Sequence, residues 1–158
     1  MIIQPKHFGK TYSSSLMASR EASEDLDQFW SSVGIGLDLA SQLELCVVEM
    51  VNNAFIHAYQ AQEGMPIELT CKIYNDPSDQ QLELRISDYG SVMSQRDLEA
   101  KLANPFIEPD PADETTWATS GRGFIIVSSL MDKVELTTTE MKNTFLMVKE
   151  LHCQLLTA

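Results

Sequence analysis

Apolar and polar positions follow two different periods along the chain, and these periods divide it into helical and extended segments. Over residues 15–33 apolar side chains recur every three or four positions, which predicts an amphipathic helix with N-cap candidates at residues 13–15. A second and more apolar helix is expected to begin at Asp38 or Ser41. It should run to about residue 62, where a glycine and a proline follow as stop signals.

The period then changes to two, which is the alternation of a strand with one covered face. Residues 67–74 and 82–87 alternate in this way on either side of the turn-rich loop 75–79, so they predict an antiparallel hairpin. Residues 6–12 are short and mixed in character, and we expect them to form an edge strand.

Residues 91–120 have no clear period and contain several prolines and acidic residues. A structureless loop of this length in a compact domain is often a functional lid, although a disordered insertion would have the same composition. Beyond it, residues 124–131 predict a helix. Residues 134–138 and 145–149 predict two strands, joined by a turn near residues 141–143.

The predicted order is therefore strand, helix, helix, strand, strand, lid, helix, strand, strand. Because helices and strands are partly segregated, this order predicts an α+β fold, a two-layer sandwich with a mostly antiparallel sheet and helices on one face. A chain of 158 residues with 44% apolar residues is large enough to bury one core. Residues 1–158 are thus expected to form a single domain.

The charge of the chain excludes some classes of partner. Asp and Glu number 23 against 11 Lys and Arg, a formal net charge of −12, which argues against binding to nucleic acid or to an anionic membrane. The three cysteines lack metal-ligand spacing, and no apolar run resembles a membrane span or a secretory signal. The expected location is the cytoplasm.

A narrow polar stripe lies within the most apolar helical segment, residues 45–59. Glu49, Asn53 and His57 are spaced four apart, and on an α-helix this spacing places them along one face. A carboxylate can accept a proton, and an amide oxygen can ligate a hard cation such as Mg²⁺. A stripe that faces water is the ordinary explanation. On so apolar a helix, however, we expect it to face a cleft or a partner.

Two glycine-containing motifs stand at the ends of predicted elements. Residues 88–90 read Asp-Tyr-Gly after an alternating strand, where a carboxylate can accept a hydrogen bond from a ligand amine and a glycine permits close approach. Residues 121–123 read Gly-Arg-Gly before a helix, where exposed N–H groups and the positive end of the helix dipole favour phosphate. Each motif alone is a weak signal, since ordinary turns contain the same residues.

In this order and spacing, the three motifs resemble the nucleotide-binding boxes of the Bergerat-fold ATP-binding superfamily, and most closely those of the anti-sigma-factor serine kinases. Residues 48–59 are similar to the asparagine box of these kinases. Residues 86–90 and 121–134 are similar to their two glycine boxes. The His-Ala-Tyr ending of the first box and the Leu-Met-Asp-Lys-Val ending of the last are fairly specific marks of this group. The likeness covers nearly the whole chain, the lid excepted.

The resemblance implies a role for each matched residue near the base and the purine. Glu49 falls on the general base and Asn53 on the Mg²⁺ ligand, while Asn52, a threonine in many relatives, lies beside it in the ATP site. Asp88 falls on the carboxylate that reads the adenine amino group. Gly90 falls on the glycine that lets the purine approach.

The resemblance also implies contacts to the phosphates and a further contact near the adenine. Gly121 and Gly123 would flank the ATP phosphates, and Arg122 would reach a phosphate unless it faces outward. Thr144 falls near a hydroxyl position close to the adenine, but Asn143 stands where a glycine often precedes it. The acidic lid is a further departure, because acids that faced inward would repel a triphosphate.

The implied activity is transfer of a phosphoryl group from ATP to a serine on a partner protein. That partner would be a STAS-type anti-sigma-factor antagonist, and a sigma factor would compete with it for the kinase, which is partner switching. A homodimer is common among the relatives. Two alternatives stay open. One is a nucleotide-dependent binding module without kinase activity. The other is a histidine-kinase catalytic domain, against which Glu49 argues because that class usually has Asn or His there.

Overall fold

A five-stranded sheet forms one layer of the computed structural model, which describes residues 6–76, 79–90 and 122–151. The strands are β1 (Lys6–Ser13), β2 (Pro66–Asp76), β3 (Asp79–Asp88), β4 (Lys133–Thr139) and β5 (Lys142–Glu150). Their order across the sheet is β1-β2-β3-β5-β4, and every neighbouring pair is antiparallel. The predicted hairpin and the predicted edge strand are both confirmed.

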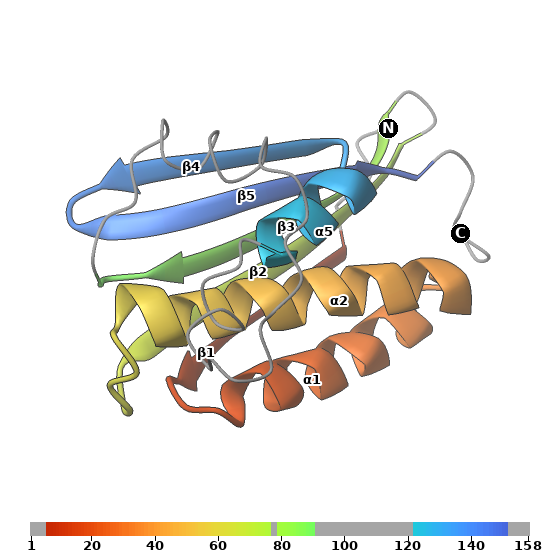
Figure 1. Ribbon diagram of the computed structural model, residues 1–158. Coiled ribbons are helices and arrows are strands. Elements are labelled where there is room, and N and C mark those ends of the chain that lie inside the picture. The colour runs from red at the N-terminus through yellow and green to blue at the C-terminus, as the bar shows by residue number, and fades with distance from the viewer. Residues whose placement is uncertain (1–5, 77–78, 91–121, 152–158) are drawn as a thin grey trace.

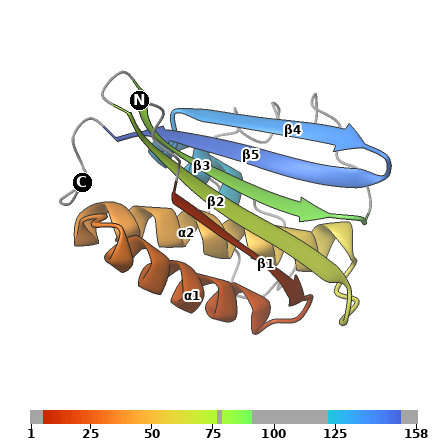
Figure 2. The same cartoon turned by 180° about the vertical axis from the view of Figure 1, so that it is seen from behind.

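Helices form the second layer and pack against one face of the sheet (Figures 1 and 2). They are α1 (Ala18–Ser32), α2 (Leu37–Asn53), the π-helix η1 (Ala54–Ala58) that continues α2, and α5 (Arg122–Leu130). Helix α2 lies between α1 and α5 and contacts both. This arrangement confirms the predicted α+β class with helices on one face. In the part of the chain that the structure describes, no helix is both long and apolar enough to cross a membrane.

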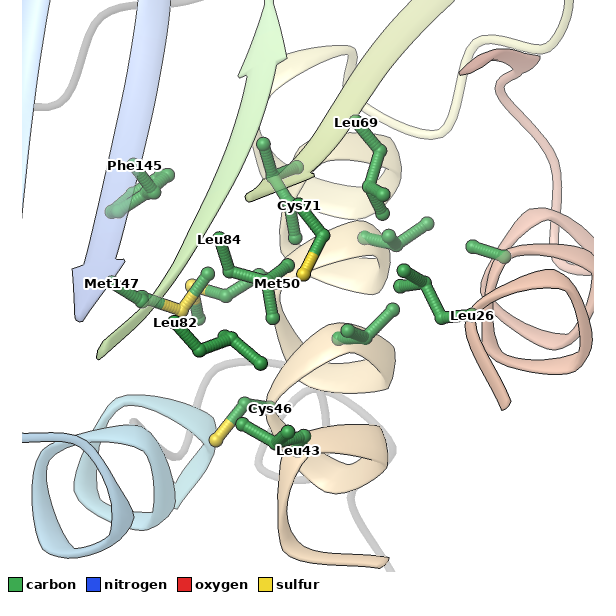
Figure 3. Packing of buried hydrophobic residues seen from close by; sticks show 14 of the residues in the cluster. Leu26, Leu43, Cys46, Met50, Leu69, Cys71, Leu82, Leu84, Phe145 and Met147 are labelled. Atoms are coloured by element: carbon green, nitrogen blue, oxygen red, sulfur yellow. The ribbon is translucent and has the colours of Figure 1, made fainter. Parts of the chain in front are cut away.

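Alternate side chains of the central strands point at the helices and form the core. Leu82, Leu84 and Ile86 of β3 are at most 1% exposed. Met50 of α2 is equally buried, and Figure 3 shows its side chain near those of Leu84 and Cys71 between helix and sheet. Full burial of a side chain of this size contributes about 1.5–3 kcal/mol. The period of two along the strands therefore determines which face the helices cover.

The second helix ends earlier than the apolar pattern predicts. Regular α-helix stops at Asn53, and η1 follows, with the Tyr59 N–H donating to the carbonyl of Ala54 five residues back, at 3.0 Å. The chain then leaves the helix through Gln60 and Ala61, whose φ angles are 52° and 63°. A π-turn adds one residue to a helical turn, so the apolar pattern continues through it without a visible break. The predicted lid, residues 91–120, lies outside the described residues and stays a prediction.

The hairpin between β4 and β5 turns one residue earlier than the sequence predicts. Thr139 pairs with Lys142, so only Glu140 and Met141 form the loop, and their φ angles are 51° and 64°. A two-residue loop with positive φ at both positions usually contains Asn-Gly. Neither residue of this loop signals such a turn, which is why the sequence misplaced it.

Replacing Met141 by glycine should stabilise the protein. Glycine adopts a φ of 64° without the steric cost of a Cβ atom, and Met141 is 79% exposed, so its removal loses little packing. We expect the free energy of unfolding to rise by about 1 kcal/mol, measured by urea denaturation. Met141→Ala is the matched control, because it removes the same side chain but keeps the Cβ. An equal gain in both variants would contradict this explanation.

Candidate functional site

The ends of β3, β4 and η1 meet the start of β5 at one end of the sandwich, which we name the Asp88 end. Asp88 closes β3 and pairs with Asn143 at the start of β5, and Asn143 pairs in turn with Thr138 of β4. Gly90, just beyond β3, lies against Ala58 at the end of η1. In Figure 1 this is the left end, where the tip of β3, the β4–β5 turn and the end of the helix that contains α2 and η1 come together.

Asp88 is a buried carboxyl group at this end, with only 2% of its surface exposed. Its Oδ1 atom accepts hydrogen bonds from Asn143 Nδ2 at 2.9 Å and from the Gly90 N–H at 3.0 Å. Burial raises the pKa of Asp88 above its usual range, and these two donors act in the opposite direction by favouring the charged form. A buried carboxyl with a perturbed pKa is a candidate for ligand recognition.

Asn143 is equally buried and uses its whole amide group. Besides its bond to Asp88, Nδ2 donates to the Gly90 carbonyl at 3.2 Å, and Oδ1 accepts from the Thr138 hydroxyl at 3.0 Å. The sequence marked Asn143 only as a departure from the family pattern and did not assign it a role. Alternation along β5 was the missed signal, since the buried Phe145 and Met147 put Asn143 on the same face.

Thr144 was predicted to lie close to the adenine, but the structure does not bring it to Asp88. It pairs with Ser87, and the two hydroxyl oxygens are 2.8 Å apart. Successive side chains of a strand point to opposite faces, so Thr144 lies on the face of the sheet away from the helices. On β5, Asn143 rather than Thr144 is the side chain beside Asp88.

Gly90 is needed for a contact within the protein, whatever it contributes to a ligand. A Cβ atom at this position would lie 2.2 Å from the carbonyl oxygen of Ala58 and 2.5 Å from its carbonyl carbon. Both of those atoms belong to the backbone and cannot rotate away. The close approach holds the end of β3 against the end of η1, so the predicted purine contact is not the only reason for a glycine here.

The hydroxyl of Tyr59 ties the ends of η1 and β3 to the start of β2. Tyr59 is 6% exposed, donates to the carbonyl of Pro66 at the start of β2, and accepts the Tyr89 N–H at 2.8 Å. Burial raises the pKa of Tyr59, so the hydroxyl keeps its proton at neutral pH. The sequence motifs assigned no such role to Tyr59. A hydrogen bond to a backbone distant in sequence leaves no trace in the apolar pattern.

Glu49, Asn52 and Asn53 lie in the last turns of α2 and are half-buried. The helix is regular from Glu49 to Asn53, so these two side chains lie on one face, one turn apart, as the spacing predicted. His57 follows within η1, where the wider turn changes the angle between successive side chains. The straight stripe therefore consists of Glu49 and Asn53.

The chemistry of this pair can be tested for a fit to Mg²⁺. Within residues 6–76, 79–90 and 122–151, no three His, Cys, Asp or Glu side chains lie together as a metal site. Asn53 offers one amide oxygen, a ligand type that Mg²⁺ accepts when substrate phosphates and water complete its shell. The residues present therefore fit an ion that enters with a nucleotide rather than one held by the protein alone.

The start of α5 is directed toward the Asp88 end. Helix α5 leads into β4, whose first residue, Lys133, pairs with Val148, far along β5 from Asn143. The C-terminus of α5 thus lies at the opposite end of the sandwich, and its N-terminus points toward the Asp88 end. Arg122 and Gly123, which the sequence placed before the helix, form its first turn. Gly121 lies outside the described residues. The free N–H groups and positive dipole of this turn suit an anion.

A family model described as "Histidine kinase-like ATPase domain" matches residues 12–149, from β1 to β5. The serine-protein kinase RsbW of Listeria innocua is 28% identical over 106 residues, which are 67% of this chain and 63% of that protein. The anti-sigma F factor of Priestia megaterium is 29% identical over 114 residues, 72% of this chain and 71% of that protein. The match to the kinase thus spans slightly less than two thirds of its length.

Gly90→Ala should destabilise the protein, because the new methyl group would overlap the Ala58 carbonyl at 2.2 Å and push β3 away from η1. We expect a loss of about 1–3 kcal/mol in the free energy of unfolding, measured in urea. The matched control is Gly9→Ala, where a Cβ would meet side chains alone, the ring of His7 at 3.2 Å and the methyl group of Thr70 at 3.6 Å. Equal losses in the two variants would argue against the backbone contact.

Asp88→Asn should stabilise the protein at neutral pH. Because folding raises the pKa of this acid, the ionised form costs stability above the pKa of the unfolded chain, and the full cost is reached above the folded pKa. Asparagine keeps the Oδ1 acceptor for Asn143 and Gly90 without the charge. The advantage of the variant in urea unfolding should therefore vanish as the pH falls through both pKa values.

Asp25→Asn is the control, because it is expected to change the stability at neutral pH in the opposite direction. Hydrogen bonds from Lys10 and Tyr12 lower the pKa of Asp25, so its stabilising contribution is present at neutral pH and lost in acid. This variant should be less stable than the wild type at neutral pH, and the difference should vanish in acid. A stability difference between Asp88→Asn and the wild type that did not change with pH would contradict the assignment for Asp88.

Proposed function

The chain belongs to the histidine kinase-like ATPase domain family, and on that premise we propose that it is an ATP-dependent protein serine kinase that acts as an anti-sigma factor. The relatives confirm the resemblance to the anti-sigma-factor kinases, since they are named serine-protein kinase and anti-sigma F factor. The observation that carries the proposal is the buried Asp88 carboxyl with its donors, at the end of the sandwich where α2 and η1 also end.

Asp88 would recognise the adenine base. Both of the described hydrogen bonds reach its Oδ1 atom, and Oδ2 would accept a hydrogen from the 6-amino group of adenine. In a buried setting such a charge-assisted bond is stronger than in water. Gly90 would let the purine lie close to the backbone, and Asn52 would line the same site from α2.

The phosphates would lie between α2 and the start of α5. Gly121, Arg122 and Gly123 would present backbone N–H groups and, from Arg122, a positive charge to the phosphate oxygens. Asn53 would hold Mg²⁺ by its amide oxygen, and the bound ion neutralises part of the triphosphate charge.

Glu49 would act as the general base for the serine hydroxyl of the acceptor. It lies on the same face of α2 as Asn53 and one turn before it. The base would therefore stand beside the phosphate that is transferred. Because phosphoryl transfer depends mainly on positioning and charge neutralisation, this geometry favours an enzyme over a passive nucleotide-binding module.

The acceptor would be a STAS-type anti-sigma-factor antagonist, and the competing partner a sigma factor. Phosphorylation of the antagonist would release it and leave the kinase free to hold the sigma factor. The net charge of −12 suits a sigma-factor partner with basic segments. We place this exchange in the cytoplasm, with the kinase as a homodimer.

Replacing Glu49 by Gln tests the assigned base. The variant should keep its affinity for ATP, because the change does not touch the adenine or phosphate contacts. Transfer of labelled phosphate from ATP to the antagonist, measured in the presence of Mg²⁺, should fall about 10²–10⁴-fold. The control is Glu24→Gln, the same change at an exposed residue of α1 that pairs with Arg20. We expect this control to transfer phosphate at the wild-type rate.

The outcomes separate the competing functions. Undiminished transfer by Glu49→Gln would overturn the role of Glu49. A wild-type protein that binds ATP but phosphorylates no antagonist would support the binding module instead. A stable phosphohistidine on a partner would support the histidine-kinase alternative. Failure of the wild type to bind ATP at all would overturn the proposed function.

A further inference from the structure

Asn143 has all of its amide hydrogen-bonding groups oriented by the fold. One Nδ2 hydrogen points at Asp88 Oδ1, 2.9 Å away, and the other at the carbonyl of Gly90, at 3.2 Å. Oδ1 of Asn143 accepts the Thr138 hydroxyl at 3.0 Å. A flipped amide would place its oxygen against two acceptor oxygens, so the chemistry permits one orientation only.

The oriented amide of Asn143 in turn restrains the carboxylate of Asp88. Its Oδ1 is held from two directions, by Asn143 on β5 and by the N–H of Gly90. A carboxylate with one oxygen fixed in this way cannot rotate about its terminal bond without losing both hydrogen bonds. The direction of Oδ2 is therefore determined by Asn143 as much as by Asp88 itself.

We propose that Asn143 is a positioning residue for purine recognition, which clamps Asp88 so that its second carboxylate oxygen meets a 6-amino group and rejects a 6-oxo group. The inference rests on the proposed function, because it assumes that Asp88 faces the base of ATP. Adenine presents a donor at this position, whereas hypoxanthine presents an oxygen that a carboxylate repels. The preference for ATP over ITP is thus a direct measure of how well Asp88 is oriented.

The surroundings of Asp88 give a second reason why the hydrogen bond from Asn143 matters for purine recognition. Burial favours the protonated carboxyl, which could donate to a 6-oxo purine and so lose the discrimination. The Asn143 donor favours the ionised form. Nearby titratable side chains are bonded to one another or to the backbone: the Tyr59 hydroxyl accepts the Tyr89 N–H, and Glu68 accepts from Lys142 and from the Tyr89 hydroxyl. None of these groups donates to Asp88 in the described hydrogen bonds.

Two substitutions at Asn143, whose new side chains match each other in shape, separate the effect of the hydrogen bond to Asp88 from the effect of shape. Asn143→Val and Asn143→Thr both suit a strand, but only threonine keeps a donor that can face Asp88. Dissociation constants for ATP and ITP would be measured by titration calorimetry on the full chain. In the valine variant we expect the preference for ATP over ITP to fall about tenfold, as for the loss of one hydrogen bond to a charged group. The threonine variant should lie closer to the wild type.

Two further variants complete the experiment. Ser87→Ala removes a buried hydroxyl that bonds Thr144 on the other face of the sheet, and it should leave the ATP preference unchanged. Thr138→Val removes one of the three hydrogen bonds that orient the Asn143 amide and should lower the preference slightly. Thr138 is exposed, so this variant keeps the inference testable if Asn143→Val does not fold, as judged by circular dichroism.

The results distinguish this inference from the function on which it rests. A wild type that prefers ATP, together with an unchanged preference in Asn143→Val, would overturn the role of Asn143 and leave the proposed function intact. Equal falls in the valine and threonine variants would overturn it as well, because shape rather than the donor would then be responsible. A wild type that binds neither nucleotide would overturn both the proposed function and this inference.

Discussion

The close contact between the backbones of Gly90 and Ala58 is the constraint on which the rest of this end of the molecule depends. It brings the end of β3 against η1, at a distance that no side chain at position 90 would allow. The same glycine also donates its N–H to Asp88 and accepts the amide of Asn143 with its carbonyl. One residue without a side chain thus joins the helical layer, β3 and β5, and it determines where the Asp88 carboxyl lies.

Burial of Asp88 shows how stability and recognition oppose each other at this end. The raised pKa of Asp88 means that the folded state disfavours its ionised carboxylate at neutral pH. The two hydrogen-bond donors offset only part of the cost of burying this charge. A protein selected for stability alone would place a neutral residue here. The costly carboxylate is understandable if a ligand supplies a further donor, which is the role that the proposed function assigns to it.

Much of the fold could be predicted from the sequence, because the apolar periods report directly which side chains are buried. The alternation along β2 and β3 and the helical period of α1 gave the element order, the antiparallel hairpin and the helices on one face. The errors have local causes. The π-turn of η1 continues the apolar pattern, and the Glu140–Met141 turn lacks the usual turn residues, so neither departure is visible in the sequence.

For the candidate site, the sequence by itself determined the kinds of residue and their order: Glu49 and Asn53 one turn apart on one helix, and a carboxylate followed by a glycine at a strand end. Only the tertiary structure decided which partners these residues meet. Asn143 rather than Thr144 faces Asp88, and Gly90 contacts Ala58. The physical reason is that period and composition report burial, which is a property of single positions. Hydrogen bonds and backbone contacts depend on strand register and on the distance between layers, which are set only when the whole sheet and its helices pack together.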